Sequence, residues 1–296
     1  MNYELAQPIK FKKMATAMGF SPMAKANLAE VHRIANAIGA ELYVLHIGVW
    51  NEQCQKTYDG FLSDLGIAPD RIHRISREGD PKKELLNLCT ENSIDLLALG
   101  ALVRESMFKV FTASIARDVC RKAKTSLLLL TQSRIEHVRC ERIVVNSLDH
   151  PKTPTSVKTA LWLSSKIKAK ELFIVDELSE QSLVKPDDDK SQLAGTRKRR
   201  QIERSEHDRI ERLLNSCEVP SELAIKEQHV FGKRGYTIAH YAKAQRADLL
   251  VVNSPDTRLG IFDRIFKHDL EYILSDLPTD VLIVHSTKDT LAHGAS

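Results

Sequence analysis

Long apolar runs are missing from this sequence. Stretches such as residues 127–130 (LLLL) are far shorter than the roughly 20 apolar residues of a helix that spans a bilayer. The first ten residues (MNYELAQPIK) lack the charged start and apolar block of a secretion signal. The five cysteines are scattered and form no C-x-x-C pair, which argues against a disulfide framework or a zinc knuckle. We therefore expect a cytoplasmic protein with reduced thiols and no contact with a membrane.

Motifs of several enzyme classes are absent as well. The eleven histidines form no H-x-x-x-H or H-E-x-x-H arrangement, so we expect no bound metal. There is no G-x-S-x-G elbow and no G-x-x-x-x-G-K-[ST] loop, which excludes the serine hydrolases built on that elbow and the P-loop ATPases. The net charge of +4 is small for 296 residues and gives no case for nucleic acid as a partner.

Short strand-like runs alternate with helical patterns in the first half, an order typical of βαβ units in a parallel sheet. Gly39 suits the end of a helix, and Asp80 followed by Pro81 suits the cap and first turn of another. A short helical or irregular stretch is expected after the second strand. Strands are predicted at 14–18, 41–49, 71–75, 95–100 and 126–131, with helices at 23–38, from Pro81 and at 112–122.

The same order begins again after a polar joint at 132–137. A strand is expected at 142–147 and a helix at 153–167, and three later segments match segments of the first half: 171–175 matches 41–45, 247–253 matches 94–100, and 279–285 matches 125–131. Several matched elements in one order indicate an internal duplication. We predict an α/β protein with two tandem domains, residues 1–135 and 136–296.

The second half contains an insert at about 179–218. Its later part has an apolar stripe at Ile202, Ile210, Leu213 and Leu214 with charges between, which predicts a long surface helix. The basic run at 197–200 (RKRR) invites a nucleic-acid hypothesis. Charges of mixed sign on an exposed helix are more commonly a solvated face, so we expect no nucleic acid there.

Four local motifs of the first half are similar to those of the universal stress proteins: Phe20-Ser-Pro22, Leu45-His-Ile47, Gly79-Asp-Pro81 and Asp95–Gly100. The whole chain resembles the tandem, two-domain members of that family. The resemblance implies two five-stranded parallel-sheet domains of Rossmann-like type, packed as a pseudo-dimer through their last strands at 126–131 and 281–285. Pairing would also remove two apolar sheet edges.

Nucleotide-binding members of that family carry a loop G-x2-G-x9-G-[ST] after the fourth strand, in which glycines let backbone N–H groups approach phosphate. The resemblance implies that ATP or AMP, if bound, would lie at Gly19, Ser21, Ile47, Gly100, Val103, Arg104, Thr112, Ala113 and Ser114.

Three of these positions depart from the family pattern. Val103 and Ala113 stand where the second and third glycines belong, and Gly19 replaces an acidic residue that contacts the sugar. A branched valine occupies space that phosphate oxygens need.

The second half departs further from that pattern. Asn253, Asp256, Phe266 and Lys267 occupy the matching places, and the charge of Asp256 would repel phosphate. Lys267 and His268 form a basic pair close to a predicted helix start, for which an anion site is the alternative to plain surface solvation.

We therefore expect a stress-response protein that binds or signals through degraded nucleotide loops and is not an enzyme, with unidentified protein partners and a homodimer as one possible assembly. The alternative is an ATP- or AMP-binding protein with slow ATP hydrolysis that uses the loop of the first half. A third hypothesis is nucleic-acid binding through residues 197–200.

Overall fold

The computed structural model describes residues 5–100, 116, 118–179, 189–255 and 263–285. The chain separates into two compact units. The first unit comprises Lys10–Cys140 and Thr279–Ser296, and the second unit comprises Met1–Ile9 and Glu141–Pro278. The units follow the two expected halves, except that each terminal segment lies with the other half. The domain limits at 135 and 136 stay a prediction.

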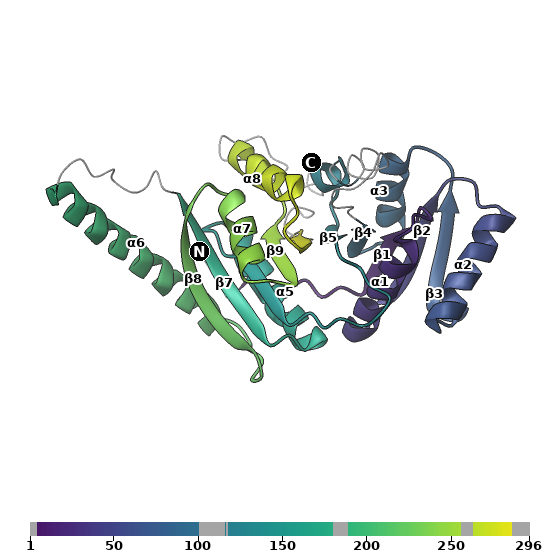
Figure 1. Ribbon diagram of the computed structural model, residues 1–296, viewed down its shortest axis with the longest axis horizontal. Helices are drawn as coiled ribbons and strands as arrows, with labels where there is room; N and C mark the ends of the chain where they lie inside the picture. The colour runs from purple at the N-terminus through teal and green to yellow at the C-terminus, as the bar shows by residue number, and fades with distance from the viewer. Residues whose placement is uncertain (1–4, 101–115, 117, 180–188, 256–262, 286–296) are drawn as a thin grey trace. The chain divides into compact units, whose positions relative to one another are not determined.

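The first unit is a mostly parallel sheet with helices packed against it (Figure 1). Its strand order is β3-β2-β1-β4-β5-β10, and β10 is antiparallel to β5. The elements are β1 (Lys13–Ala17), α1 (Ala24–Ile38), β2 (Glu41–Ile47), α2 (Glu52–Leu65), a 3₁₀ turn (Pro69–Arg71), β3 (Ile72–Arg77), α3 (Pro81–Glu91), β4 (Leu96–Gly100), β5 (Ser126–Leu130) and β10 (Asp280–Val284).

The second unit has a parallel sheet in the order β9-β6-β7-β8. Its elements are β6 (Arg142–Asn146), α5 (Thr153–Ile167), β7 (Glu171–Ser179), α6 (Asp189–Asn215), β8 (Ala224–Gly232), α7 (Tyr236–Ala244), β9 (Leu249–Asn253) and α8 (Asp263–Ser275). Helices α5 and α6 lie behind this sheet and α7 and α8 lie in front of it (Figure 1), as right-handed crossovers require.

Local sequence explains where the helices begin and end. Asp80 Oδ1 accepts a hydrogen bond from Lys83 N at 2.9 Å, and Gly39 ends α1 with a φ of 71°, so both predictions are confirmed. The stretch after β2, expected to be short and helical or irregular, is helical and regular. A regular helix of 14 residues, α2, forms there because Asn51 caps its start and Gly66 ends it with a φ of 63°.

Matching contacts recur in the two units. Asp95 Oδ2 accepts hydrogen bonds from Lys12 N and Lys13 N at the start of β1. Asp248 Oδ2 accepts the same pair of bonds from the backbone of residues 141 and 142 at the start of β6. Each carboxylate thereby ties the start of one central strand to the segment before the next, in agreement with the predicted duplication.

The last strands of the two halves pair, as the resemblance implied. β5 and β10 match Leu127 with Ile283 and Leu129 with Val281, and every residue of β5 is buried. Asp280 Oδ1 accepts bonds from Thr131 N at 2.7 Å and Thr131 Oγ1 at 2.9 Å. The apolar edge of β5 is therefore covered by another strand.

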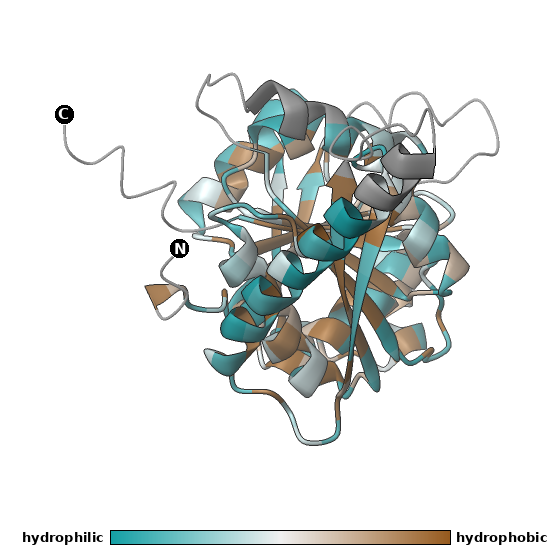
Figure 2. Ribbon diagram, turned by 90° about the vertical axis from the view of Figure 1, so that its left-hand side faces the viewer, coloured by the Kyte–Doolittle hydropathy of each residue, from teal (hydrophilic) through white to brown (hydrophobic). Residues whose placement is uncertain are grey.

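Helix α6 is amphipathic, as its sequence predicted. Ile210 and Leu213 are fully buried, and the helix is predominantly hydrophilic along the side seen in Figure 2. Arg197, Lys198 and Arg200 are exposed, whereas Arg199 bonds Glu203 and lies over the Phe231 ring at 4.5 Å. Mixed charges on a solvated face thus account for most of the basic run.

Candidate functional site: the carboxyl ends of the strands

The first unit brings several predicted nucleotide residues to one edge of its sheet. Gly19 follows β1, Ile47 ends β2 and Gly100 ends β4, and β1 lies between β2 and β4. The chain order reverses at β1, and open α/β sheets bind ligands at such a reversal, beyond the carboxyl ends of the strands. The predicted residues that the structure describes therefore lie where this fold offers a site.

Gly100 has a packing role at that edge. A Cβ on Gly100 would lie 2.3 Å from Nδ2 of Asn27, in the first turns of α1. The Asn27 amide therefore fills the space beside Gly100, and a side chain at position 100 would require Asn27 to move. This contact gives Gly100 a packing neighbour independent of any phosphate.

Among the described residues, no atom lies within 4 Å of the position that a Cβ would take on Gly19, so these residues leave open space beside it. Ser21 is exposed in the turn before α1. The other predicted members of the loop, Val103, Arg104, Thr112, Ala113 and Ser114, lie outside the described residues.

An aromatic cluster covers the end of β2. The Phe20 ring lies 5.5 Å from His46 and 5.6 Å from Trp50 between centroids, and Arg74 lies over Trp50 at 4.3 Å. His46 is buried, with Nδ1 2.9 Å from Met18 O. The His-Ile-Gly segment at 46–48 is thus part of a packed cluster.

In the second unit the matching edge is filled by the chain's own side chains. Lys152 is only 6% exposed, and its Nζ donates to Ser254 O at 3.3 Å, Ser254 Oγ at 3.1 Å and Pro255 O at 3.3 Å. A buried ammonium is stable only with such acceptors. The Lys152 ammonium therefore binds the acceptors of residues 254 and 255, which directly follow β9.

At one matched contact, the larger residue lies on the helix in the first unit and on the strand in the second. Asn253 takes the place of Gly100, and Ser156 takes the place of Asn27. Ser156 Oγ donates to Asn253 Oδ1 at 2.6 Å, and Asn253 Nδ2 donates to Thr153 Oγ1 at 3.0 Å. An asparagine amide therefore fills this place in both units, from the helix in one and from the strand in the other.

A buried ionic network holds α6 against the sheet of the second unit. Asp176 and Arg209 are 1% and 6% exposed, and Arg209 Nη2 lies 3.3 Å from Asp176 Oδ1 and 2.5 Å from Ser147 O. Arg209 Nε donates to Glu206 at 2.6 Å. His229 Nδ1 lies 3.8 Å from Asp176 Oδ2, and the Asp176 carboxylate raises the pKa of His229.

The next residue, Glu177, acts on the opposite face. Its carboxylate accepts bonds from Gly235 N and Ile238 N, both at 2.9 Å, and so caps the N-terminus of α7. In the first unit the matching helix is capped locally by Asp80. Burial raises the pKa of Glu177 to about 7, although the two N–H groups favour its charged form.

Glu177 makes the second unit sensitive to pH in a defined direction. Because its pKa in the folded chain lies above the value of 4.5 for a free side chain, the folded state binds more protons between these values, and its stability falls as pH rises from about 4.5 to about 7. We expect Glu177→Gln to remove about 3 kcal/mol of this pH dependence.

The measurement is urea unfolding between pH 4.5 and 8. The chain has two tryptophans, Trp50 in the first unit and Trp162 in the second, so a Trp50→Phe background reports on the second unit. Exposed Glu222→Gln serves as the control, since it should leave the pH profile unchanged. A wild-type slope retained in Glu177→Gln would contradict this role.

Lys267 and His268, the predicted basic pair, belong to α8, which begins at Asp263, so they lie in its second turn. An anion site at this pair stays a prediction. Among the described residues, no group of three His, Cys, Asp or Glu side chains could hold a metal ion. No described helix is long and apolar enough to cross a bilayer.

The cysteines that the structure describes are all free. Cys89 and Cys120 are buried, and burial raises the pKa of Cys89 to about 12. The complete burial of Cys120 argues against reactivity of its thiol.

Three solved structures resemble this chain over most of its length. A functionally unknown protein from Pseudomonas aeruginosa PAO1 matches with a TM-score of 0.65 and 15% identity, covering 98% of this chain and 96% of its own. A protein described as a universal stress protein from Pseudomonas aeruginosa UCBPP-PA14 matches with a TM-score of 0.63 and 14% identity, covering 99% and 100%. A universal stress protein from Archaeoglobus fulgidus DSM 4304 matches with a TM-score of 0.55 and 15% identity, covering 92% and 95%.

The fold is that of universal stress proteins. The resemblance noted in the sequence is thereby confirmed at the level of the fold. No family model matches the sequence, and no curated protein matches it. The sequence identities are near 15%. Any ligand of this chain must therefore be inferred from its own residues.

Sequence reasoning missed the ionic residues of the second unit. Asp176 and Glu177 are adjacent acids inside an otherwise apolar strand, and adjacent strand residues point to opposite faces. Two buried partners, one on each face, could have been expected from that pattern. Lys152 carried no comparable indication, because it lies in a polar turn.

Proposed function

We propose that this chain is a binding or signalling protein of the universal stress protein type that catalyses no reaction, and that its second unit takes no nucleotide. The buried Lys152 ammonium carries this proposal, since it already occupies the backbone acceptors that follow β9. Removing it to admit a ligand would leave those acceptors unsatisfied. The second unit would then act as a scaffold.

The first unit supports a second candidate function, the binding of ATP or AMP with slow hydrolysis. The observation in its favour is the arrangement of Gly19, Ile47 and Gly100 at one edge, with open space beside Gly19. Against it, Asn27 already uses the gap at Gly100, and Val103 and Ala113 replace two glycines of the family loop. We therefore place nucleotide binding second.

Isothermal titration of the full chain with ATP and with AMP distinguishes the two functions. We expect no saturable binding at micromolar concentration, because the loop has lost glycines that would admit phosphate oxygens. Micromolar binding that Ser114→Ala abolishes and Lys152→Met leaves unchanged would establish the first unit as a nucleotide site. It would overturn our preference.

A further inference from the structure

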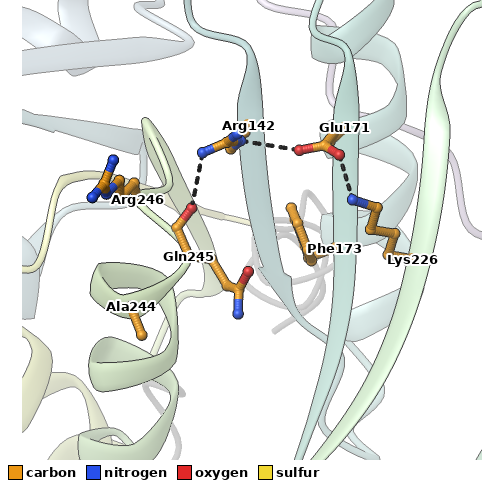
Figure 3. Close-up of a pocket in the computed structure, with 7 residues that line it drawn as sticks. All are labelled: Arg142, Glu171, Phe173, Lys226, Ala244, Gln245 and Arg246. Atoms are coloured by element: carbon orange, nitrogen blue, oxygen red, sulfur yellow. Dashed lines mark hydrogen bonds and ion pairs between the residues drawn. The ribbon is translucent and has the colours of Figure 1, made fainter.

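A second feature of the second unit lies at the opposite end of its sheet, at the amino ends of the strands. A cavity of about 300 Å³ opens there, lined by Arg142, Glu171, Phe173, Lys226, Ala244, Gln245 and Arg246. This volume is at the lower end of the range for small-molecule sites. Figure 3 shows Glu171 between Arg142 and Lys226, with Arg246 on the other side of Arg142.

Positive charge is in excess in this cavity. Glu171 is bound by Arg142 Nε at 3.0 Å and by Lys226 Nζ, so its single charge is shared by two cations. The guanidinium of Arg246 has no hydrogen bond or ion pair in the part of the chain that the structure describes. Three cations and one carboxylate thus line the cavity.

The C-terminal end of α7 also borders the cavity and contributes about half a negative charge. Arg142 Nη1 donates to Gln245 O at that end, at a long distance of 3.5 Å. Asp248, whose Oδ2 accepts from Arg142 N, is not among the residues that line the cavity. Among the lining residues, one carboxylate and one helix end do not balance three cations, so net positive charge remains to be satisfied by water or by a ligand.

The first unit provides an internal comparison, because it builds the same arrangement without the excess charge. The matched pairs are Lys13 with Arg142, Glu41 with Glu171, Tyr43 with Phe173, His73 with Lys226, and Ser93 with Arg246.

The contacts at these matched positions are alike. Lys13 Nζ donates to Asn92 O at 3.3 Å, His73 Nε2 lies 3.8 Å from Glu41 Oε2, and His73 stacks on Tyr43 at 4.7 Å. In the second unit Lys226 lies over Phe173 at 5.0 Å. The shared contacts are therefore structural, and the two added cations are not needed for them.

Backbone conformation leads to the same conclusion. Ser93 and Arg246 both have positive φ, 54° and 51°, so the turn accepts a small side chain as readily as an arginine. The turn gives no structural reason for arginine at 246. Arginine in place of serine therefore adds a cation that the backbone conformation does not require.

From these observations we propose that the amino end of the second unit's sheet binds a compact anion with two or more negative charges, such as a diphosphate group, through Arg142, Lys226 and Arg246. Guanidinium groups bind phosphate oxygens in bidentate fashion. Phe173 forms an apolar wall beside them. This site lies at the amino ends of the strands, whereas the candidate nucleotide site lies at the carboxyl ends.

Pyrophosphate is the probe, titrated into the full chain in a buffer without phosphate at pH 8 and constant ionic strength. We expect saturable binding with a dissociation constant of roughly 1 mM or below. The double variant Lys226→His/Arg246→Ser, which restores the residues of the first unit, should raise this constant about tenfold or more.

The matched control is Lys198→His/Arg204→Ser on α6, which makes the same change in charge on the other face of the sheet. Its binding should equal that of the wild type. The single variant Arg246→Gln, with unchanged circular dichroism, separates loss of the site from loss of folding. Absence of saturable binding, or equal losses in the double variant and the control, would overturn the proposal.

Discussion

Replacing Arg209 by methionine is expected to lower the free energy of unfolding of the second unit by about 3–5 kcal/mol, the usual result of removing one member of a buried ion pair. Asp176 is only 1% exposed, and its Oδ1 would lose the guanidinium at 3.3 Å. Ser147 O would lose a donor as well. Urea unfolding followed by Trp162 fluorescence in the Trp50→Phe background measures the change.

The loss should depend on pH. His229 lies 3.8 Å from Asp176 Oδ2, and its protonated form would partly replace the missing cation. Because the pKa of His229 is raised, we expect a smaller loss near pH 6 than at pH 8. Glu227 Oε1 lies 3.1 Å from His229 Nε2, and Glu227 and Glu203 also raise the pKa of His229. Arg199 and His207 pair with these two glutamates.

Two variants control the interpretation. Arg212→Met, on the exposed side of the same helix, should change stability by less than about 0.5 kcal/mol. Adding Asp176→Asn to Arg209→Met should restore part of the loss, because the buried charge is then removed. Equal effects of Arg209→Met and Arg212→Met would show that Asp176 is not held by Arg209.

Replacing Gly235 by alanine is expected to destabilise the second unit by about 3 kcal/mol or more. Gly235 has φ 78° and ψ −38°, a conformation strained for a residue with a side chain. Its Cβ would also lie 2.2 Å from Asp269 O in α8, so overpacking adds to the strain. Movement of residue 235 would also displace its N–H group, which donates a hydrogen bond to Glu177 at 2.9 Å.

Gly39→Ala is the matched control in the first unit. Gly39 has a similar φ of 71°, but no atom in the described part of the chain lies within 4 Å of its Cβ position. We expect a loss of only about 1 kcal/mol there, measured by Trp50 fluorescence in a Trp162→Phe background. Similar losses for both glycines would mean that α8 moves away from Gly235 without penalty.

The fold was predictable because its local patterns agree with one another. Gly39, Asp80 and the apolar strand at 126–131 each identified an element that the structure contains. The pairing of β5 with β10 followed from the family resemblance and from the apolar edge it covers. Helix α2 was the weaker prediction, since only Tyr58 and Leu62 of its side chains are buried and its apolar pattern is thin.

The site was harder to predict, because its residues act through contacts that are distant in sequence. Gly100 matched a family motif, yet its immediate neighbour is Asn27, more than 70 residues earlier. Lys152 reaches Ser254 across 102 residues. Arg246 differs from Ser93, its counterpart in the first unit, only at the level of the paired structure, since a lone surface arginine is ordinary in any sequence.

The adjacent acids of β7, Asp176 and Glu177, also help to fix the register in which that strand pairs. Asp176 faces α6 and Glu177 faces α7, so sliding β7 by one residue would exchange the faces on which the two carboxylates lie. The guanidinium of Arg209 and the amide groups of Gly235 and Ile238 would then each lose the oxygen placed for them. A misaligned chain would bury unpaired charge, and this penalty favours a single pairing of β7 with its neighbours.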